Sequence, residues 1–130
     1  MKTLINRDCL EWLRETDGNW DVGIADIPDN LGLDYDTYVD KKEDYYDWVE
    51  LLLRTALPRF KVFWLSYYHK HQVEVMYRLR CVLNNSLKRD VKGYIWRFNF
   101  GQYTETDNPN GWRPFLRISR PDWRFSAKRR

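Results

Sequence analysis

The sequence lacks the features that mark secreted and membrane proteins. Its 130 residues include only two cysteines, Cys9 and Cys81, which excludes a disulfide framework and is typical of a reducing, cytoplasmic location. No apolar run approaches the roughly 20 residues of a membrane-spanning helix, so we expect no membrane partner. Charges enter the amino terminus too early for the apolar core of a signal peptide.

Aromatic residues and charge are plentiful but unevenly distributed. Aromatic residues make up 17% of the chain and hydrophobic residues 43%, which excludes a disordered protein and suits one domain over residues 1–130. Residues 1–50 hold 14 acidic against 5 basic side chains, whereas residues 51–130 hold 5 acidic against 17 basic. A split of this kind indicates a basic half that faces a polyanion.

Short β-like runs alternate with helix-like runs, which predicts an α/β sheet. Asp8 is placed to cap the first helix, with Glu11 at the capping-box spacing. In the last helix we expect three residues to face inward: Val73, Met76 and Tyr77. We expect strands over residues 3–6, 20–25, 60–65, 91–98 and 115–118, and helices from Asp8 to the turn at 17–19, over 43–57 and over 69–79.

One segment carries a chemical signal. Residues 24–32, Ile-Ala-Asp-Ile-Pro-Asp-Asn-Leu-Gly, place an acid, a proline and Asn-x-Gly directly after a predicted strand, where open α/β sheets bind ligands. This segment resembles the motif Asp-Pro-Pro-Tyr, followed by Asn-x-Gly, of DNA amino-methyltransferases. Residues 5–13 are similar to that family's opening Ile-Asn-Gly-Asp-Cys-Leu-Glu. Residues 95–102 and 112–116 are similar to its strand and loop behind the target base.

The resemblance implies a site that methylates the exocyclic amine of a base swung out of the DNA duplex, with S-adenosylmethionine as donor. By position, the Asp26 carboxylate and the Ile27 carbonyl would accept from that amine, and Pro28 would stiffen the turn. The implied catalytic residues are Asp26, Ile27, Pro28 and Asp29, and the implied substrate-binding residues are Asn30, Gly32, Trp96 and Arg113.

The motif differs from the family pattern at two positions. Ile27 replaces the first proline, whose contact is made by backbone. Asp29 replaces the aromatic residue, and a carboxylate cannot stack on a base and should be repelled by Asp26. Tyr35 and Tyr38 are alternative stacking residues that spacing does not separate.

The family's glycine-rich cofactor motif, Phe-x-Gly-x-Gly, is absent, since no two of the six glycines form Gly-x-Gly. We therefore expect a partial, three-layer, Rossmann-like sheet with strands missing, and no S-adenosylmethionine bound by this chain alone. In the family, two further strands separate the first strand from the one that ends at Asp26. Without them we expect a free edge, covered by another chain, by a second copy or by the amino-terminal strand.

The basic carboxyl-terminal half combines arginines with aromatic rings, as nucleic-acid-binding surfaces do. We expect Trp96 and Phe98 or their neighbours to pack inward. We expect Arg117, Arg120 and Arg124 to be exposed and to contact DNA. Neither the acidic residues 34–47 nor His69, His71 and Cys81 have the spacing of a metal site, so no metal is expected.

The leading hypothesis is therefore the target-base half of a DNA amino-methyltransferase, inactive alone and dependent on a complementing chain or an oligomer. The alternative is a non-catalytic domain that binds nucleic acid or a protein through the basic aromatic half. A third possibility is a phage or mobile-element protein that blocks or scaffolds a partner, but no motif supports it.

Overall fold

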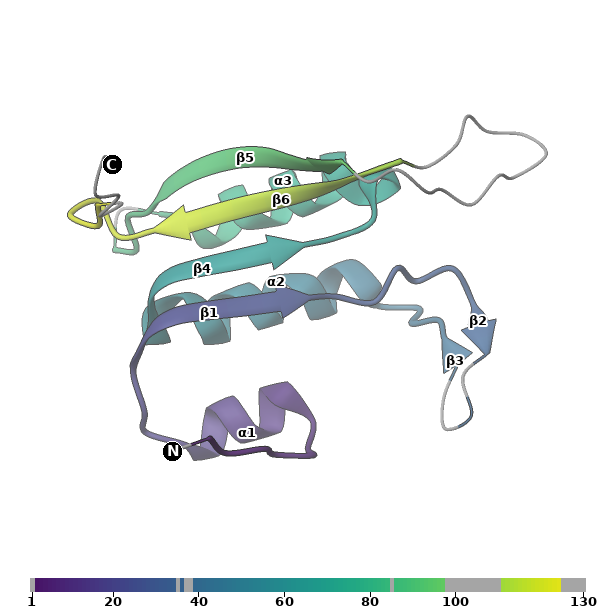
Figure 1. Ribbon diagram of the computed structural model, residues 1–130, viewed down its shortest axis with the longest axis horizontal. Helices are drawn as coiled ribbons and strands as arrows, with labels where there is room; N and C mark the ends of the chain where they lie inside the picture. Colours follow the sequence, from purple (N-terminus) through teal and green to yellow (C-terminus); the bar gives the residue numbers. More distant parts are fainter. Residues whose placement is uncertain (1, 35, 37–38, 85, 98–110, 125–130) are drawn as a thin grey trace.

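The computed structural model describes residues 2–34, 36, 39–84, 86–97 and 111–124 (Figure 1). Its helices are α1 (Cys9–Glu15), α2 (Tyr45–Ala56) and α3 (Gln72–Val82), with 3-10 turns η1 (Leu57–Arg59) and η2 (His69–His71). Its strands are β1 (Trp20–Asp26), β2 (Leu33–Asp34), β3 (Val39–Asp40), β4 (Phe60–Ser66), β5 (Asp90–Arg97) and β6 (Trp112–Ser119).

The four longer strands form one open mixed sheet in the order β1-β4-β6-β5. β1 and β4 are parallel and are connected through α2, whereas β6 runs antiparallel to both β4 and β5. β2 and β3 form a separate small hairpin within the loop after β1. The predicted α/β class is confirmed.

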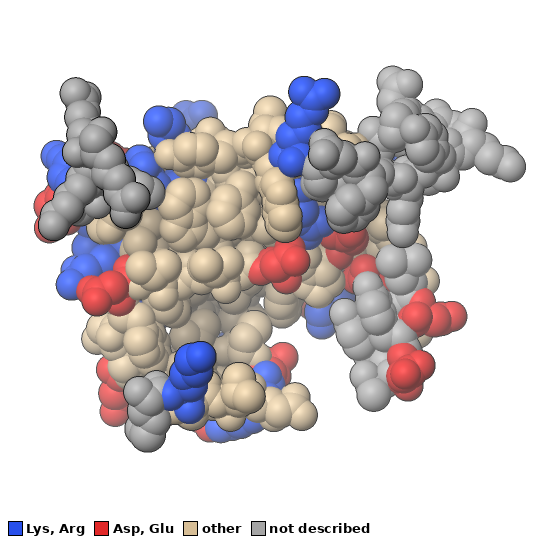
Figure 2. Space-filling model, viewed as in Figure 1, with Lys and Arg blue, Asp and Glu red and all other residues tan. Residues whose placement is uncertain are grey.

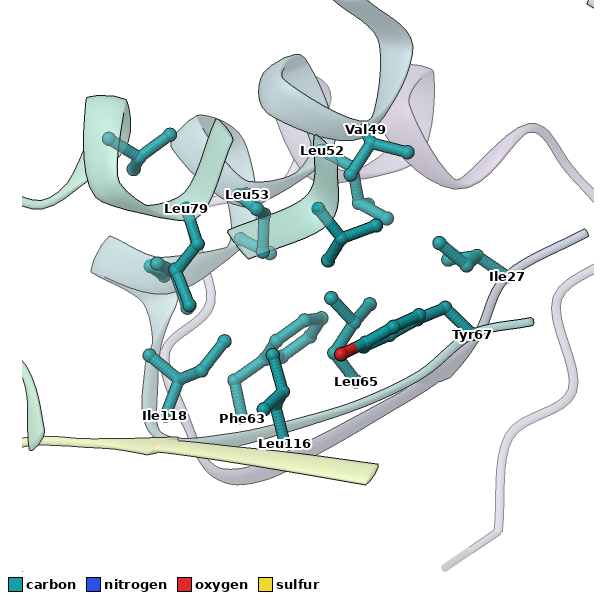
Figure 3. Packing of buried hydrophobic residues seen from close by; sticks show 14 of the residues in the cluster. Ile27, Val49, Leu52, Leu53, Phe63, Leu65, Tyr67, Leu79, Leu116 and Ile118 are labelled. Atoms are coloured by element: carbon teal, nitrogen blue, oxygen red, sulfur yellow. The ribbon is translucent and has the colours of Figure 1, made fainter. Parts of the chain in front are cut away.

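α2 and α3 cover one face of the sheet, and Figure 1 views the molecule from the other face, with α1 beyond the β1 edge. Among the described residues the fold therefore has two layers, and the expected third layer is not formed. Alternate residues of β4 and β6 explain the covered face: Phe63, Leu65, Leu116 and Ile118 point toward the helices (Figure 3). They meet apolar side chains of α2 and α3, including Val49, Leu52, Leu53 and Leu79.

Most predicted elements form close to their expected positions. The predicted strands 20–25, 60–65, 91–98 and 115–118 correspond to β1, β4, β5 and β6, and the predicted helix 43–57 corresponds to α2. Asp8 caps α1 as predicted, because its Oδ1 accepts from the backbone N–H groups of Leu10 (2.9 Å) and Glu11 (3.0 Å). No helix among these residues is long and apolar enough to cross a membrane.

The predicted strand at residues 3–6 is wrong. That segment pairs with no strand, and Leu4 is 99% exposed. It leads into α1, which is held in the helix layer by Leu10 and Leu13 and by Arg59, whose guanidinium donates to the backbone carbonyls of Leu13, Thr16 and Gly18. The segment is thereby kept away from β1, so the amino terminus does not cover the sheet edge.

The predicted inward face of the last helix is also wrong. Val73 is 79% exposed and Tyr77 and Met76 are exposed, whereas Val75, Leu79 and Val82 are buried. The first turn of the predicted helix is instead the 3-10 turn η2, so α3 starts three residues later, at Gln72. Different residues of the helix therefore face the sheet. The spacing of four and three residues along the buried stripe matches a regular helix.

β1 lies at one edge of the sheet and pairs only with β4 within the described part of the chain. Its outer row of backbone groups faces a cavity of about 450 Å³ between α1, β1 and α2. The hollow is visible between the sheet and α1 in Figure 2. The expected free edge is thus present.

Two glycines on the helix-facing side of the sheet allow a matched test of this packing. A Cβ at Gly23 would lie 2.6 Å from the ring of Phe63 and 2.7 Å from that of Phe60, whereas a Cβ at Gly93 would lie 3.8 Å from Leu116. We predict that Gly23→Ala lowers the free energy of unfolding by about 1–3 kcal/mol through overpacking. Gly93→Ala should leave it unchanged or raise it by about 0.4–1 kcal/mol. Urea denaturation measures both, and equal losses would contradict the packing around Phe63.

Candidate functional site

The residues predicted to be catalytic lie at the carboxyl end of β1. Asp26 is the last residue of the strand, and its side chain is 73% exposed. Ile27 is buried, and its N–H donates to the Ser66 carbonyl (3.1 Å) at the end of the neighbouring strand β4. Ile27 is therefore a core residue that anchors the turn. Its side chain points inward while its carbonyl stays at the site.

The rest of the loop is held by two residues that the sequence interpretation did not place at the site. The Tyr45 hydroxyl of α2 donates to the Pro28 carbonyl (2.6 Å). Buried Asp40 accepts from the N–H of Asn30 at its carboxylate (3.0 Å) and from the N–H of Gly32 at its carbonyl (2.7 Å). Asn30 and Gly32 both have positive φ, at 55° and 79°, which suits a tight turn. These two residues form the loop and do not join the Asp26 cluster.

Arg113 of β6 connects the whole site. Its Nη2 donates to Asp26 Oδ1 (2.8 Å) and to the Ile27 carbonyl (3.3 Å), and its Nη1 donates to Asp29 Oδ1 (2.8 Å). Its Nε donates to Ser66 Oγ (2.6 Å). Both carboxylates thus pair with one guanidinium, and the repulsion expected between Asp26 and Asp29 is offset by Arg113.

Ser66 was missed because the predicted strand ended one residue earlier, at Leu65. Its signal was nevertheless present, since carboxyl ends of parallel strands meet at one edge of a sheet and Ser66 is in register with Asp26. Tyr35 and Tyr38, the alternative stacking residues, lie outside the described residues, as does Phe98.

His71 contacts the backbone of the loop at Asp29. Its Nε2 lies 2.7 Å from the Asp29 carbonyl and its Nδ1 lies 2.8 Å from the Tyr46 hydroxyl. His69 instead stacks on Trp112, with ring centroids 4.9 Å apart. Within the described ranges no three His, Cys, Asp or Glu side chains converge as metal ligands. His71 therefore has a positioning role at the loop.

Trp96 lies directly across from Arg113 in the pairing of β5 with β6. Trp96 is 60% exposed and Ile95 is 69% exposed, so within the described part of β5 the expected inward packing of Trp96 or its neighbours is wrong. The neighbouring rings of the open face form a cluster: Trp64 stacks on Phe115 (5.2 Å between centroids) and contacts Tyr94 (5.5 Å). Figure 2 shows that this face is largely uncharged across its middle.

The three arginines predicted to contact nucleic acid do not join the carboxylate cluster. Arg117 lies in the middle of β6, with its guanidinium 5.0 Å from the centre of the Trp123 ring. Arg120 and Arg124 follow β6, at the end of the sheet opposite Asp26, and Arg124 donates to the carbonyls of Pro121 and Trp123. Arg124 is exposed, whereas Arg117 and Arg120 are only partly exposed.

The cavity beside Asp26 does not fit S-adenosylmethionine on its own. It is lined mainly by apolar side chains such as Trp12, Trp48 and Phe63, and among the described residues that line it Asp26 is the single charged one. The cofactor carries ribose hydroxyls and a charged amino-acid group, which require polar partners when buried. No lining residue is a glycine, so the close backbone approach of a nucleotide site is missing as well.

No model of a known protein family matches the chain, and no curated protein matches it. The arrangement of Asp26, Ile27, Asp29, Ser66 and Arg113 is therefore the main guide to function.

Tyr45 provides a pH-dependent test of the loop. Burial raises the pKa of Tyr45, and the nearby carboxylates of Asp29 and Asp40 raise it further. Its contribution to stability should be complete below about pH 10, the ordinary tyrosine value, and should decline as the pH rises toward the folded-state pKa. We predict that Tyr45→Phe lowers the free energy of unfolding by about 1 kcal/mol at neutral pH. Urea denaturation from pH 7 to 11 should show the difference between the two proteins shrinking above pH 10. A constant difference would contradict a proton held by Tyr45.

Proposed function

We propose that this protein is the target-base half of an S-adenosylmethionine-dependent DNA amino-methyltransferase, inactive alone and completed by another chain. One observation carries the proposal. The Asp26 carboxylate and the Ile27 carbonyl accept from a single planar nitrogen, Arg113 Nη2, at 2.8 Å and 3.3 Å. The resemblance assigns this same pair of acceptors to the exocyclic amine of the target base.

The chemistry of the two donors supports the comparison. A guanidinium nitrogen and the amine of adenine or cytosine are both planar NH₂ groups attached to an electron-poor carbon, and each offers two hydrogens in one plane. Two acceptors on the same side of such a nitrogen orient it and draw electron density toward it. The loop that holds these acceptors is fixed by Tyr45, Asp40 and His71, so the pair is preorganised.

The surroundings suit DNA as the partner. Extruding a base costs a few kcal/mol of lost stacking, which a protein has to restore through stacking and hydrogen bonds. Trp96 is exposed beside the site, and the rings of Trp64, Phe115 and Tyr94 lie on the same open face. Arg117 and Lys92 lie directly across from each other on β6 and β5 and add positive charge at one place on that face, where Lys92 lies over the Tyr94 ring.

A complementing chain would pair with the free edge of β1 and fill the cavity between β1 and α1. In the proposed assembly this second chain supplies the missing strands of a Rossmann-like sheet and the glycine-rich cofactor site. The edge offers a row of backbone donors and acceptors next to about 450 Å³ of apolar space, which suits a strand with apolar side chains.

The alternative function is nucleic-acid binding without catalysis. The cluster of Trp64, Phe115 and Tyr94 on an uncovered sheet face favours it, because stacking platforms on open sheets bind single strands. In this alternative the carboxylate cluster is structural, and affinity depends on rings and arginines. The two functions therefore differ in their dependence on Asp26.

The leading proposal is tested with a DNA duplex that carries 2-aminopurine next to a mismatched adenine, since its fluorescence rises when the neighbouring adenine leaves the stack. We predict that Asp26→Ala lowers the affinity for the extrahelical base by about tenfold or more, because hydrogen bonds to charged groups contribute about 1.5–3 kcal/mol. Asp21→Ala is the matched control, since Asp21 lies in the same strand, is 78% exposed and pairs with Lys61. An equal response of the two variants would rule out Asp26 as the amine acceptor.

The alternative makes a separate prediction at Trp96. Replacing this exposed ring with alanine should weaken binding of single-stranded DNA by about 1–3 kcal/mol if one base stacks on it. Fluorescence anisotropy with a labelled oligonucleotide measures the change, and Asp26→Ala should leave this affinity unaltered. Unchanged binding in Trp96→Ala would remove Trp96 from the proposed binding surface.

A further inference from the structure

Arg113 forms hydrogen bonds at the site through all three nitrogens of its guanidinium group. Each of its three nitrogens donates to an acceptor, at Asp26 and Ile27, at Asp29 and at Ser66, and its side chain is only 18% exposed. The surrounding oxygens, from Asp26, Ile27, Asp29 and Ser66, form an acceptor-rich cradle around the planar guanidinium. Its ligand class is therefore a planar N–H donor, namely a guanidinium, an amidinium or an aminated base.

A base amine and Arg113 cannot occupy the cradle together. Nη2 already lies 2.8 Å from Asp26 Oδ1 and 3.3 Å from the Ile27 carbonyl, and a second nitrogen within reach of both oxygens would overlap it. Binding of a base through these acceptors thus requires the guanidinium to leave.

The loop that carries the acceptor oxygens is held more firmly than the ion pair between Asp26 and Arg113. The acceptor loop is anchored by the buried side chain and the N–H of Ile27, by the Tyr45 hydroxyl and by His71, and none of these contacts involves Arg113. Asp26, by contrast, is 73% exposed, and ion pairs of exposed side chains are weak and readily exchanged. The cradle can therefore stay in place while the arginine swings toward solvent.

We propose that Arg113 is the resident occupant of the target-amine site, and that a DNA phosphate draws its guanidinium out so that the base can enter. This inference rests on the proposed function. The guanidinium keeps an anionic partner in the exchange, since it passes from two carboxylates to a phosphate, which it can bind in a bidentate manner, and the Asp26 carboxylate accepts from the base amine instead. The gate therefore opens when DNA arrives and closes over the acceptors when DNA is absent.

The cradle itself is tested without DNA. Arg113→Ala should bind guanidinium ion at low millimolar concentration, seen as a saturable rise in melting temperature that wild type lacks. Adding Asp26→Ala to Arg113→Ala should abolish the rise. Arg78→Ala is the matched control, because Arg78 also contacts two carboxylates, Asp47 and Glu50, but through one nitrogen only. Failure of Arg113→Ala to bind guanidinium, or equal binding by Arg78→Ala, would overturn the cradle.

The gate is tested with the 2-aminopurine duplex. Arg113→Ala should place the base in the site at several-fold lower protein concentration than wild type, and an equal midpoint in the two proteins would overturn the gate. If neither protein takes up the base while Arg113→Ala still binds guanidinium, the target-base function fails together with its gate and the cradle remains. Uptake of the base by wild type with no gain in Arg113→Ala leaves the proposed function standing and removes only the gate.

A measurement on the wild-type chain covers the case in which Arg113→Ala does not fold. The Nε–H of Arg113 is bonded to Ser66 Oγ, so its ¹⁵N-resolved proton should exchange slowly with water in the free protein. Addition of the duplex should accelerate that exchange as the guanidinium leaves. Slow exchange that persists at saturating DNA would overturn the proposal.

Discussion

The site depends on one guanidinium shared between two carboxylates. Asp26 and Asp29 lie three residues apart at the end of β1, and the carbonyl of Ile27 is turned toward the same space. Arg113 offsets the repulsion between these oxygens, while the loop itself is also anchored by contacts that do not involve the arginine. Arg113 lies on β6, which is separated from β1 by β4, so its side chain ties the ends of three strands together. The rest of the loop is arranged around that contact, with Tyr45 and His71 holding it from the helix side.

The elements could be predicted where periodicity and capping are local properties. The cap at Asp8, the strand ending at Asp26 and the apolar run of β4 follow from patterns of a few residues. The prediction failed where the outcome depends on a distant partner. Residues 3–6 have the composition of a strand but lie next to no strand with which they pair. The buried face of α3 differs from the expected one because the first turn of the predicted helix is the 3-10 turn η2.

The candidate site shows the same division. The motif indicated Asp26, Ile27, Pro28 and Asp29 because they are contiguous, and they do form one loop. Arg113 was named from a separate segment of the resemblance, and nothing local predicted that it would reach Asp26 across β4. His71 and Asp40 had no signal at all, since each acts on the backbone of a segment more than eight residues away. A contact to a backbone carbonyl or N–H does not depend on the side chain of the partner residue, so the partner's residue type does not indicate it.

The uneven charge of the two halves of the sequence is reflected in the ion pairs of the site. The acidic half supplies the carboxylates and the basic half supplies the arginine that neutralises them, so the site is held by attraction between distant parts of the chain. A polyanion competes for that arginine with the protein's own carboxylates. Because Asp26 is largely exposed and Arg113 is not, the contact is broken most readily from the solvent side of Asp26, where a phosphate would approach. Under the proposed function, a site held closed by its own ion pair would respond to nucleic acid through electrostatics before any base is recognised.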